Sequence, residues 1–129
     1  MSEYLFTYGT LRPGCAPGEI SQAVGKLRLV GRGFVGGTVY DLGEYPGAVV
    51  DPSSTRRISG SVYRLPEDAG VLLELDGYEG FTADAPEESL FIRMLHTMTF
   101  EEGGTLQCWV YTYNRNPGLA RILADGEDW

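Results

Sequence analysis

The stretch that decides the fold is residues 29–42, LVGRGFVGGTVYDL, in which four glycines interrupt a run of apolar and β-branched residues. A glycine inside a strand weakens a flat ladder and marks a bulge, a bend or a close approach of another backbone. The segment is therefore predicted to be one strand that curves strongly. Curvature of this kind is typical of the wall of a barrel.

Four further strands are expected around this one, because each is rich in β-branched or aromatic residues and bounded by turn residues. They are residues 4–8, 58–65, 89–100 and 105–114. Glu101-Glu102-Gly103-Gly104 joins the last two and is a hairpin signal. In residues 44–50, Tyr45-Pro46-Gly47 brings a proline that cannot donate a central-strand hydrogen bond. We expect that segment at the rim of the sheet.

Two short helices are predicted to flank the strands. Residues 20–27 place Ile20, Ala23, Val24 and Leu27 on one helical face. The second helix is expected to begin with Pro66 at its first position, followed by two acidic residues in the first turn. Its buried face would be Val71, Leu72 and Leu75, and either Gly77 or Gly80 can end it.

The order of these elements favours an α+β fold, a small closed or strongly curved mixed β-barrel with flanking short helices. A length of 129 residues suits one domain spanning 1–129, with a short tail from about residue 115. The tail is expected to form a short turn of helix before its acidic end.

Composition excludes several classes of partner. The net charge is −8, and only ten basic residues are spread along the chain, so nucleic acid is a poor partner. We expect no membrane span, because no run approaches about 18 apolar residues. Cys15 and Cys108 are expected to be unpaired in a cytoplasmic protein, since nothing at the start of the chain is typical of a secretion signal. A single histidine, His96, predicts no metal centre.

One familiar motif lacks the structural context that its function needs, and another is absent. Residues 31–36, GRGFVG, match the G-x-G-x-x-G of a dinucleotide site, but strand-like residues follow where that site needs a helix. A bent strand is the better interpretation. No G-x-S-x-G nucleophile elbow is present, and neither Cys15 nor Cys108 has the local signature of an activated thiol. His96 in mid-strand is expected to be packed or surface-exposed rather than catalytic.

Two segments can carry chemistry. In Tyr8-Gly9-Thr10-Leu11, a strand ends in a turn whose backbone N–H groups can bind a carboxylate or an oxyanion, although a turn without function fits equally well. Glu79 follows the second helix, where the helix dipole disfavours its anion and raises its pKa, as a proton shuttle needs. The alternative is a solvated glutamate. Asp76 can pair with Glu79 or, more simply, bond local backbone.

Taken together, these segments resemble the gamma-glutamylcyclotransferase-like family. The resemblance rests on the order and spacing of Tyr8-Gly9-Thr10-Leu11-Arg12, Tyr45-Pro46-Gly47, Gly60-x-Val62-Tyr63, Leu75-Asp76-x-x-Glu79-Gly80, Arg93 and Val110-Tyr111-x-Tyr113. It implies a barrel with one cavity, Glu79 as the general acid/base, and substrate binding by Tyr8, Gly9, Thr10, Leu11, Tyr45 and Pro46. Two departures are Pro13 to Gly18, where the family often has a polar stretch, and Phe91, where it commonly has tyrosine.

The implied activity is cleavage of a gamma-glutamyl amide, with release of a free amine and formation of 5-oxoproline. The substrate's own α-amine is the nucleophile, so no cofactor is expected and the missing catalytic triad is explained. Two alternatives stay open, a non-catalytic small-molecule-binding barrel of the same fold and an interaction protein with an acidic surface. The leaving amine and the oligomeric state are left open as well.

Overall fold

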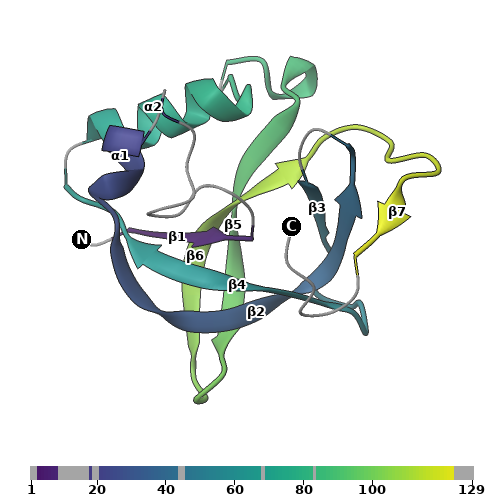
Figure 1. Cartoon of the computed structure of the whole chain (residues 1–129), viewed down its shortest axis with the longest axis horizontal. Coiled ribbons are helices and arrows are strands. Elements are labelled where there is room, and N and C mark those ends of the chain that lie inside the picture. Colours follow the sequence, from purple (N-terminus) through teal and green to yellow (C-terminus); the bar gives the residue numbers. More distant parts are fainter. Residues whose placement is uncertain are drawn as a thin grey trace.

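The structure, a computed structural model, describes residues 3–8, 18, 21–43, 46–67, 69–82 and 84–123. Figure 1 shows α1 and α2 together on one side of a curved sheet, with the long β5–β6 hairpin reaching away from them. The elements in chain order are β1 (Tyr4–Thr7), α1 (Ser21–Gly25), β2 (Arg28–Asp41), β3 (Pro46–Val50), β4 (Arg57–Arg64), α2 (Ala69–Glu79), the 3-10 helix η1 (Pro86–Glu88), β5 (Phe91–Phe100), β6 (Thr105–Tyr113) and β7 (Arg121–Ile122).

The strands close into a mixed barrel, as the sequence predicts. They are ordered β2-β4-β1-β6-β5, and β5 pairs back onto β2. β1 runs parallel to β6, whereas the other pairs are antiparallel. The closing contact pairs Gly33 with Phe100, and a Cβ at Gly33 would lie only 2.2 Å from the carbonyl oxygen of Thr99. The barrel therefore needs glycine at position 33, because another backbone occupies that space.

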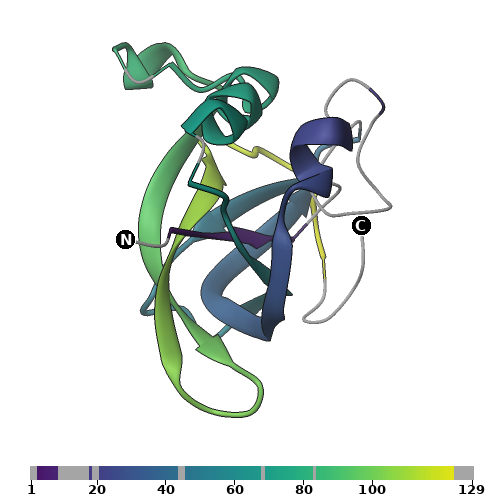
Figure 2. The same ribbon diagram turned by 90° about the vertical axis from the view of Figure 1, so that its left-hand side faces the viewer.

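The strands carry a hydrophobic cluster on each face. The barrel interior holds eight buried residues, namely Phe6, Val35, Ala48, Ile58, Val62, Met98, Cys108 and Val110. The second cluster lies between the strands and the helices and is made of Leu5, Ala23, Val24, Leu27, Tyr63, Leu65, Val71, Leu75, Phe91 and Tyr111. Figure 2 shows both helices above the barrel strands, the side on which this second cluster lies. Cys108, in the interior, is a free thiol.

β3 and β7 extend β2 beyond the barrel, and β7 corrects the prediction for the tail. Pro46 is the first residue of β3 and pairs with Asp41, a position that leaves no central hydrogen bond for it to supply. The expected helical turn after residue 115 is wrong for the described residues. A turn around Gly118 is followed by β7, which pairs with Tyr40 and Asp41 of β2.

The second helix begins later than predicted. α2 starts at Ala69, because the chain at Leu65 still follows β1, where the Leu65 N–H donates to the Glu3 carbonyl. Pro66 is thus not its first residue. The helix ends at Glu79, and Gly80 takes the left-handed conformation with φ +71°. No helix within the described ranges combines the length and the apolar character needed to cross a membrane.

Candidate active site

Glu79 is held at the end of α2 by local backbone chemistry. The Gly80 N–H donates to the Gly77 carbonyl at 3.3 Å, and the Phe81 N–H donates to the Asp76 carbonyl at 2.9 Å. These two bonds and the positive φ of Gly80 form a Schellman motif, for which glycine is the preferred residue. The motif fixes the last residue of the helix. Glu79 therefore has a defined position relative to the sheet below α2.

The environment of Glu79 suits a proton carrier. Burial raises the pKa of Glu79 to about 7. The direction agrees with the sequence prediction, but burial of the carboxyl is the cause in the structure, where the helix dipole was expected. A carboxyl that titrates near neutrality can both accept and donate a proton at physiological pH. The residue is half-buried, and its role as a proton carrier stays a prediction.

Tyr8 ties the end of β1 to two other strands. Its hydroxyl donates to the Tyr111 carbonyl on β6 at 2.6 Å and accepts from the Ala48 N–H on β3 at 3.3 Å. Burial raises the pKa of Tyr8 far above its ordinary value, and the charge of Glu79 adds to the rise. The phenol is therefore neutral. The charge of Glu79 thus acts on Tyr8, and the shared role of the two residues in the predicted site stays a prediction.

Of the other predicted site residues, the structure describes only Pro46. Pro46 is buried at the start of β3, two residues before the Ala48 that binds Tyr8. Its strand therefore adjoins the end of β1. Gly9, Thr10, Leu11 and Tyr45 lie outside the described residues. Their predicted part in binding substrate stays a prediction.

Asp76 has partners that the sequence interpretation missed. Its Oδ1 accepts hydrogen bonds from Arg93 Nε on β5 and from the Tyr111 hydroxyl on β6, both at 2.7 Å. Its Oδ2 accepts from Arg93 Nη2 at 3.1 Å. The simpler expectation, a side chain bonding local backbone, is wrong. Tyr111 and Tyr113 are two residues apart on β6, so they lie on the same face of the strand. This alternation is the sequence signal for the polar contacts between β6 and α2.

Arg93 is enclosed by aromatic rings as well as by the carboxylate. Its guanidinium lies 4.3 Å from the ring centroid of Trp109 and 5.6 Å from that of Phe81. Stacking on aromatic faces suits the planar guanidinium and holds its orientation. Phe91, the departure noted above, is buried nearby with its ring centroid 5.5 Å from that of Tyr113. Phe91 therefore serves packing at the position where the family commonly has tyrosine.

His96 does not join the site. It lies on β5 opposite Cys108, three residues after Arg93 and so on the other face of the strand. Burial lowers the pKa of His96, and its Nε2 is buried without a hydrogen-bond partner. Within the part of the chain that the structure describes, no three His, Cys, Asp or Glu side chains are grouped to hold a metal ion.

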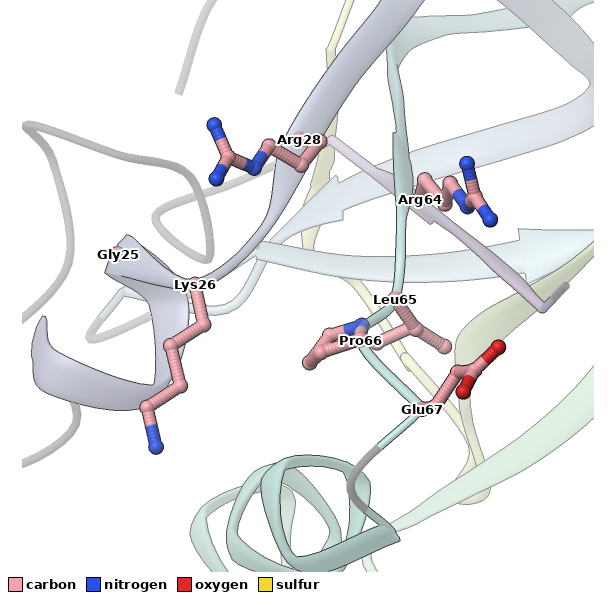
Figure 3. A pocket seen from close by; sticks show the side chains of 7 residues that line it. All are labelled: Gly25, Lys26, Arg28, Arg64, Leu65, Pro66 and Glu67. Carbon is pink, nitrogen blue, oxygen red and sulfur yellow. The ribbon is translucent and has the colours of Figure 1, made fainter.

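A separate groove lies beside α1, near the start of β2 and the end of β4. It has a volume of about 560 Å³ and is lined by Gly25, Lys26, Arg28, Arg64, Leu65, Pro66 and Glu67. Figure 3 shows that the charged ends of Lys26, Arg28 and Arg64 point in different directions. They do not converge on one ligand position. None of Tyr8, Pro46 and Glu79, the predicted site residues that the structure describes, lines this groove.

A closed mixed barrel, with a half-buried glutamate of raised pKa at the end of α2 and neutral tyrosines near it, is an arrangement suited to proton transfer. Residues 5–129 match the model of the family described as gamma-glutamyl cyclotransferase, AIG2-like. The chain belongs to this family and is a cyclotransferase-like enzyme.

Known proteins are similar over nearly the whole chain. The gamma-L-glutamyl-butirosin B gamma-glutamyl cyclotransferase of Niallia circulans is 28% identical over 126 residues, 97% of this chain and 76% of that protein. A Drosophila melanogaster relative, named provisionally as a gamma-glutamylcyclotransferase, is 31% identical over 127 residues, 91% of this chain and 73% of that protein. The crystal structure of an AIG2-like protein from Mus musculus shares the fold, with a TM-score of 0.71, 23% identity, and coverage of 96% of this chain and 87% of that one.

Proposed function

We propose that this enzyme cleaves gamma-glutamyl amides by cyclisation, releasing a free amine and 5-oxoproline, with Glu79 as the single general acid/base. The observation that carries the proposal is the half-buried Glu79 at the end of α2, whose carboxyl pKa is raised to about 7 beside neutral Tyr8 and Tyr111. The family supports the general activity. The 5-oxoproline product and the role of Glu79 are part of the proposal.

The reaction balances with one carboxyl. The Glu79 carboxylate takes a proton from the substrate's α-ammonium, and the freed amine attacks the γ-carbonyl carbon to form the new C–N bond of a five-membered ring. The tetrahedral oxyanion then collapses as the old C–N bond breaks, and Glu79 gives its proton to the leaving nitrogen. The carboxylate next takes the second proton from the ring nitrogen, which leaves a neutral lactam, and passes it to the released amine, which departs as an ammonium ion. Ring closure of this kind gains about 7–11 kcal/mol from proximity in well-oriented cases, so the protein needs no nucleophile of its own.

Substrate binding is assigned to the segment that follows Tyr8. The N–H groups of Gly9, Thr10 and Leu11 would bind the α-carboxylate or the oxyanion, and Tyr8, Tyr45 and Pro46 would line the pocket. The support is the hydroxyl of Tyr8, which anchors the start of this segment to Tyr111 and Ala48. No cofactor takes part in the proposed chemistry. The proposed location is the cytoplasm, and the proposed partner is a small gamma-glutamyl substrate.

The test compares wild type with Glu79→Gln on a panel of gamma-glutamyl amines, one of them gamma-L-glutamyl-butirosin B, by measuring 5-oxoproline and released amine. Gln keeps the size of the side chain but cannot carry the proton. We expect kcat to fall by at least about 10²-fold, the low end for general acid/base catalysis. KM should change little, because the fold and the binding segment remain.

Glu74→Gln is the matched control, because Glu74 is an exposed residue of the same helix. It should leave kcat unchanged. Undiminished turnover in Glu79→Gln would exclude the mechanism. A wild type that returns every amine substrate unchanged would favour a binding barrel instead.

A further inference from the structure

The Asp76–Arg93 ion pair differs from the other ion pairs that the structure describes. Its side chains are 8% and 14% exposed, whereas those of Glu101 and Arg32 are 60% and 52% exposed. The buried pair has two hydrogen bonds between its partners and a third from Tyr111. The exposed pair has its charged atoms 4.0 Å apart. Of the ion pairs among the described residues, the buried one is the pair that joins α2 to the barrel.

Stability alone is a weak explanation for such a pair. Removing two charges from water is costly, and a buried ion pair often stabilises a protein no more than well-packed apolar residues of the same volume. What the pair supplies is a fixed geometry. The bidentate guanidinium is held between Trp109 and Phe81, so the carboxylate it binds has one defined position.

The pair acts on the turn of α2 that carries Glu79. Asp76 and Glu79 are three residues apart, so they lie on neighbouring positions of one helix face. Tyr111, the third partner, has its phenol on Asp76 and its carbonyl on the Tyr8 hydroxyl. The chain of contacts thus runs from β5 through α2 and β6 to the end of β1. Both ends of the proposed site are attached to it.

We propose that Asp76 is a positioning residue: through Arg93 and Tyr111 it fastens the last turn of α2 to β5 and β6 and so keeps the Glu79 carboxyl in its buried place. This inference rests on the proposed function for its effect on turnover. Its effect on the position of Glu79 is independent of any substrate.

The groups that face Glu79 make its titration a usable reporter. In the described residues, the phenols of Tyr8, just after β1, and of Tyr111 on β6 are in electrostatic contact with Glu79, and the raised pKa of each keeps it neutral. Asp76 on α2 and Arg93 on β5 compensate each other's charge. Removing both charges together therefore leaves no unpaired buried ion. Any change in the pKa of Glu79 then reports on its burial.

The experiment uses the double variant Asp76→Asn/Arg93→Met and follows the Glu79 carboxyl by NMR titration of the whole chain. If the pair holds Glu79 in place, its carboxyl will reach water in the variant, and its pKa will fall by at least about one unit toward the ordinary value. With an active substrate, kcat should fall by about tenfold or more, because small misplacements of a catalytic group are costly. KM should change less, since Asp76 does not bind substrate.

Arg32→Met/Glu101→Gln is the matched control, because it removes an exposed ion pair in the same way. It should leave both the Glu79 pKa and kcat unchanged. Thermal unfolding of both double variants separates loss of position from loss of stability. A purely structural pair would lower the melting temperature and leave the Glu79 pKa unchanged in the folded protein, and this result would overturn the proposal.

Arg93→Lys decides the matter if the double variant does not fold. Lysine keeps the charge but loses the two-pronged bond and the planar stacking, so a smaller fall in the Glu79 pKa and in kcat is expected. Wild-type values for both would contradict the proposal. If wild type releases no 5-oxoproline, the proposed reaction fails, and the NMR titration still decides whether Asp76 positions Glu79.

Discussion

The two faces of β6 differ in what they contribute. Cys108 and Val110 point into the barrel interior, where the buried cluster is almost wholly apolar. Trp109, Tyr111 and Tyr113 point to the helix-covered face, where the rings meet Arg93 and the Tyr111 hydroxyl binds Asp76. Strand alternation thus gives the inner face to apolar packing alone, whereas the outer face combines packing with the polar contacts of Arg93 and Asp76. A substitution on the inner face should therefore leave the pKa of Glu79, on the outer face, unchanged.

The largest expected effect is on stability, and it should be similar for the two faces. Met98→Ala in the interior and Leu75→Ala under α2 each remove a side chain that is 0% exposed, and each should destabilise the fold by about 2–5 kcal/mol. Only Leu75→Ala should also lower the Glu79 pKa, because it loosens the helix that carries Glu79. Chemical denaturation and NMR titration measure the two quantities.

Leu73→Ala is the control for the helix variant, because Leu73 lies on the same helix and is 67% exposed. It should change stability by no more than about 0.5 kcal/mol. Equal shifts of the Glu79 pKa in Met98→Ala and Leu75→Ala would show that the two faces are not independent.

A second prediction concerns pH and the cost of burying Glu79. Its pKa is about 7 in the folded state and about 4.3 in an unfolded chain, so between these values the folded state binds the extra proton. Stability must therefore fall as pH rises through this window and level off above it. Glu79→Gln removes this dependence, and its stability relative to wild type should rise by at most about 3 kcal/mol from pH 4 to pH 8.

Denaturant unfolding of wild type and Glu79→Gln at several pH values tests this sign. Glu74→Gln, on the exposed side of α2, should track wild type at every pH. A Glu79→Gln variant that is less stable than wild type at pH 8 would show that the carboxylate is favoured in the folded protein, contrary to its burial.

The smallest effect is expected at the interior thiol. Burial raises the pKa of Cys108 to about 12, and the side chain is fully buried. In a Cys15→Ser background, Cys108 should not react with a thiol reagent at pH 8 until denaturant unfolds the protein, because thiolate and access are both lacking. Mass spectrometry of the labelled protein measures this. Rapid labelling of the folded chain would mean that the interior is open.

Local patterns predicted much of the fold. The five barrel strands are confirmed within a few residues, because each has its own alternation and turn residues. Gly80 was one of two predicted helix ends, and its positive φ shows why it is the one used. β7 was missed because two residues carry no periodicity, and its pairing with Tyr40 and Asp41 is a long-range contact. The start of α2 was misplaced because Leu65 is bound by Glu3, far away in sequence.

The candidate site, too, was predicted only in part. Glu79 was singled out from its position between a helix and a glycine, and the direction of its pKa shift agrees with that expectation, whereas its role stays a prediction. Its burial could not be predicted from the sequence, because burial depends on how α2 lies on the sheet. Asp76 was assigned local backbone partners, whereas its partners are 17 and 35 residues away. Contacts at such separations leave no trace in local spacing.

The parallel pairing of β1 with β6 has a consequence for how the chain folds. β1 lies between β4 and β6, so the strand nearest the start of the chain completes its pairing only when one of the last strands arrives. Such a contact closes a loop of almost the whole domain, and contacts at high sequence separation slow folding. Until that step, one edge of β1 is open to other chains. Tyr8 also lacks its acceptor on β6 until then, so the proposed active site should be among the last features to form.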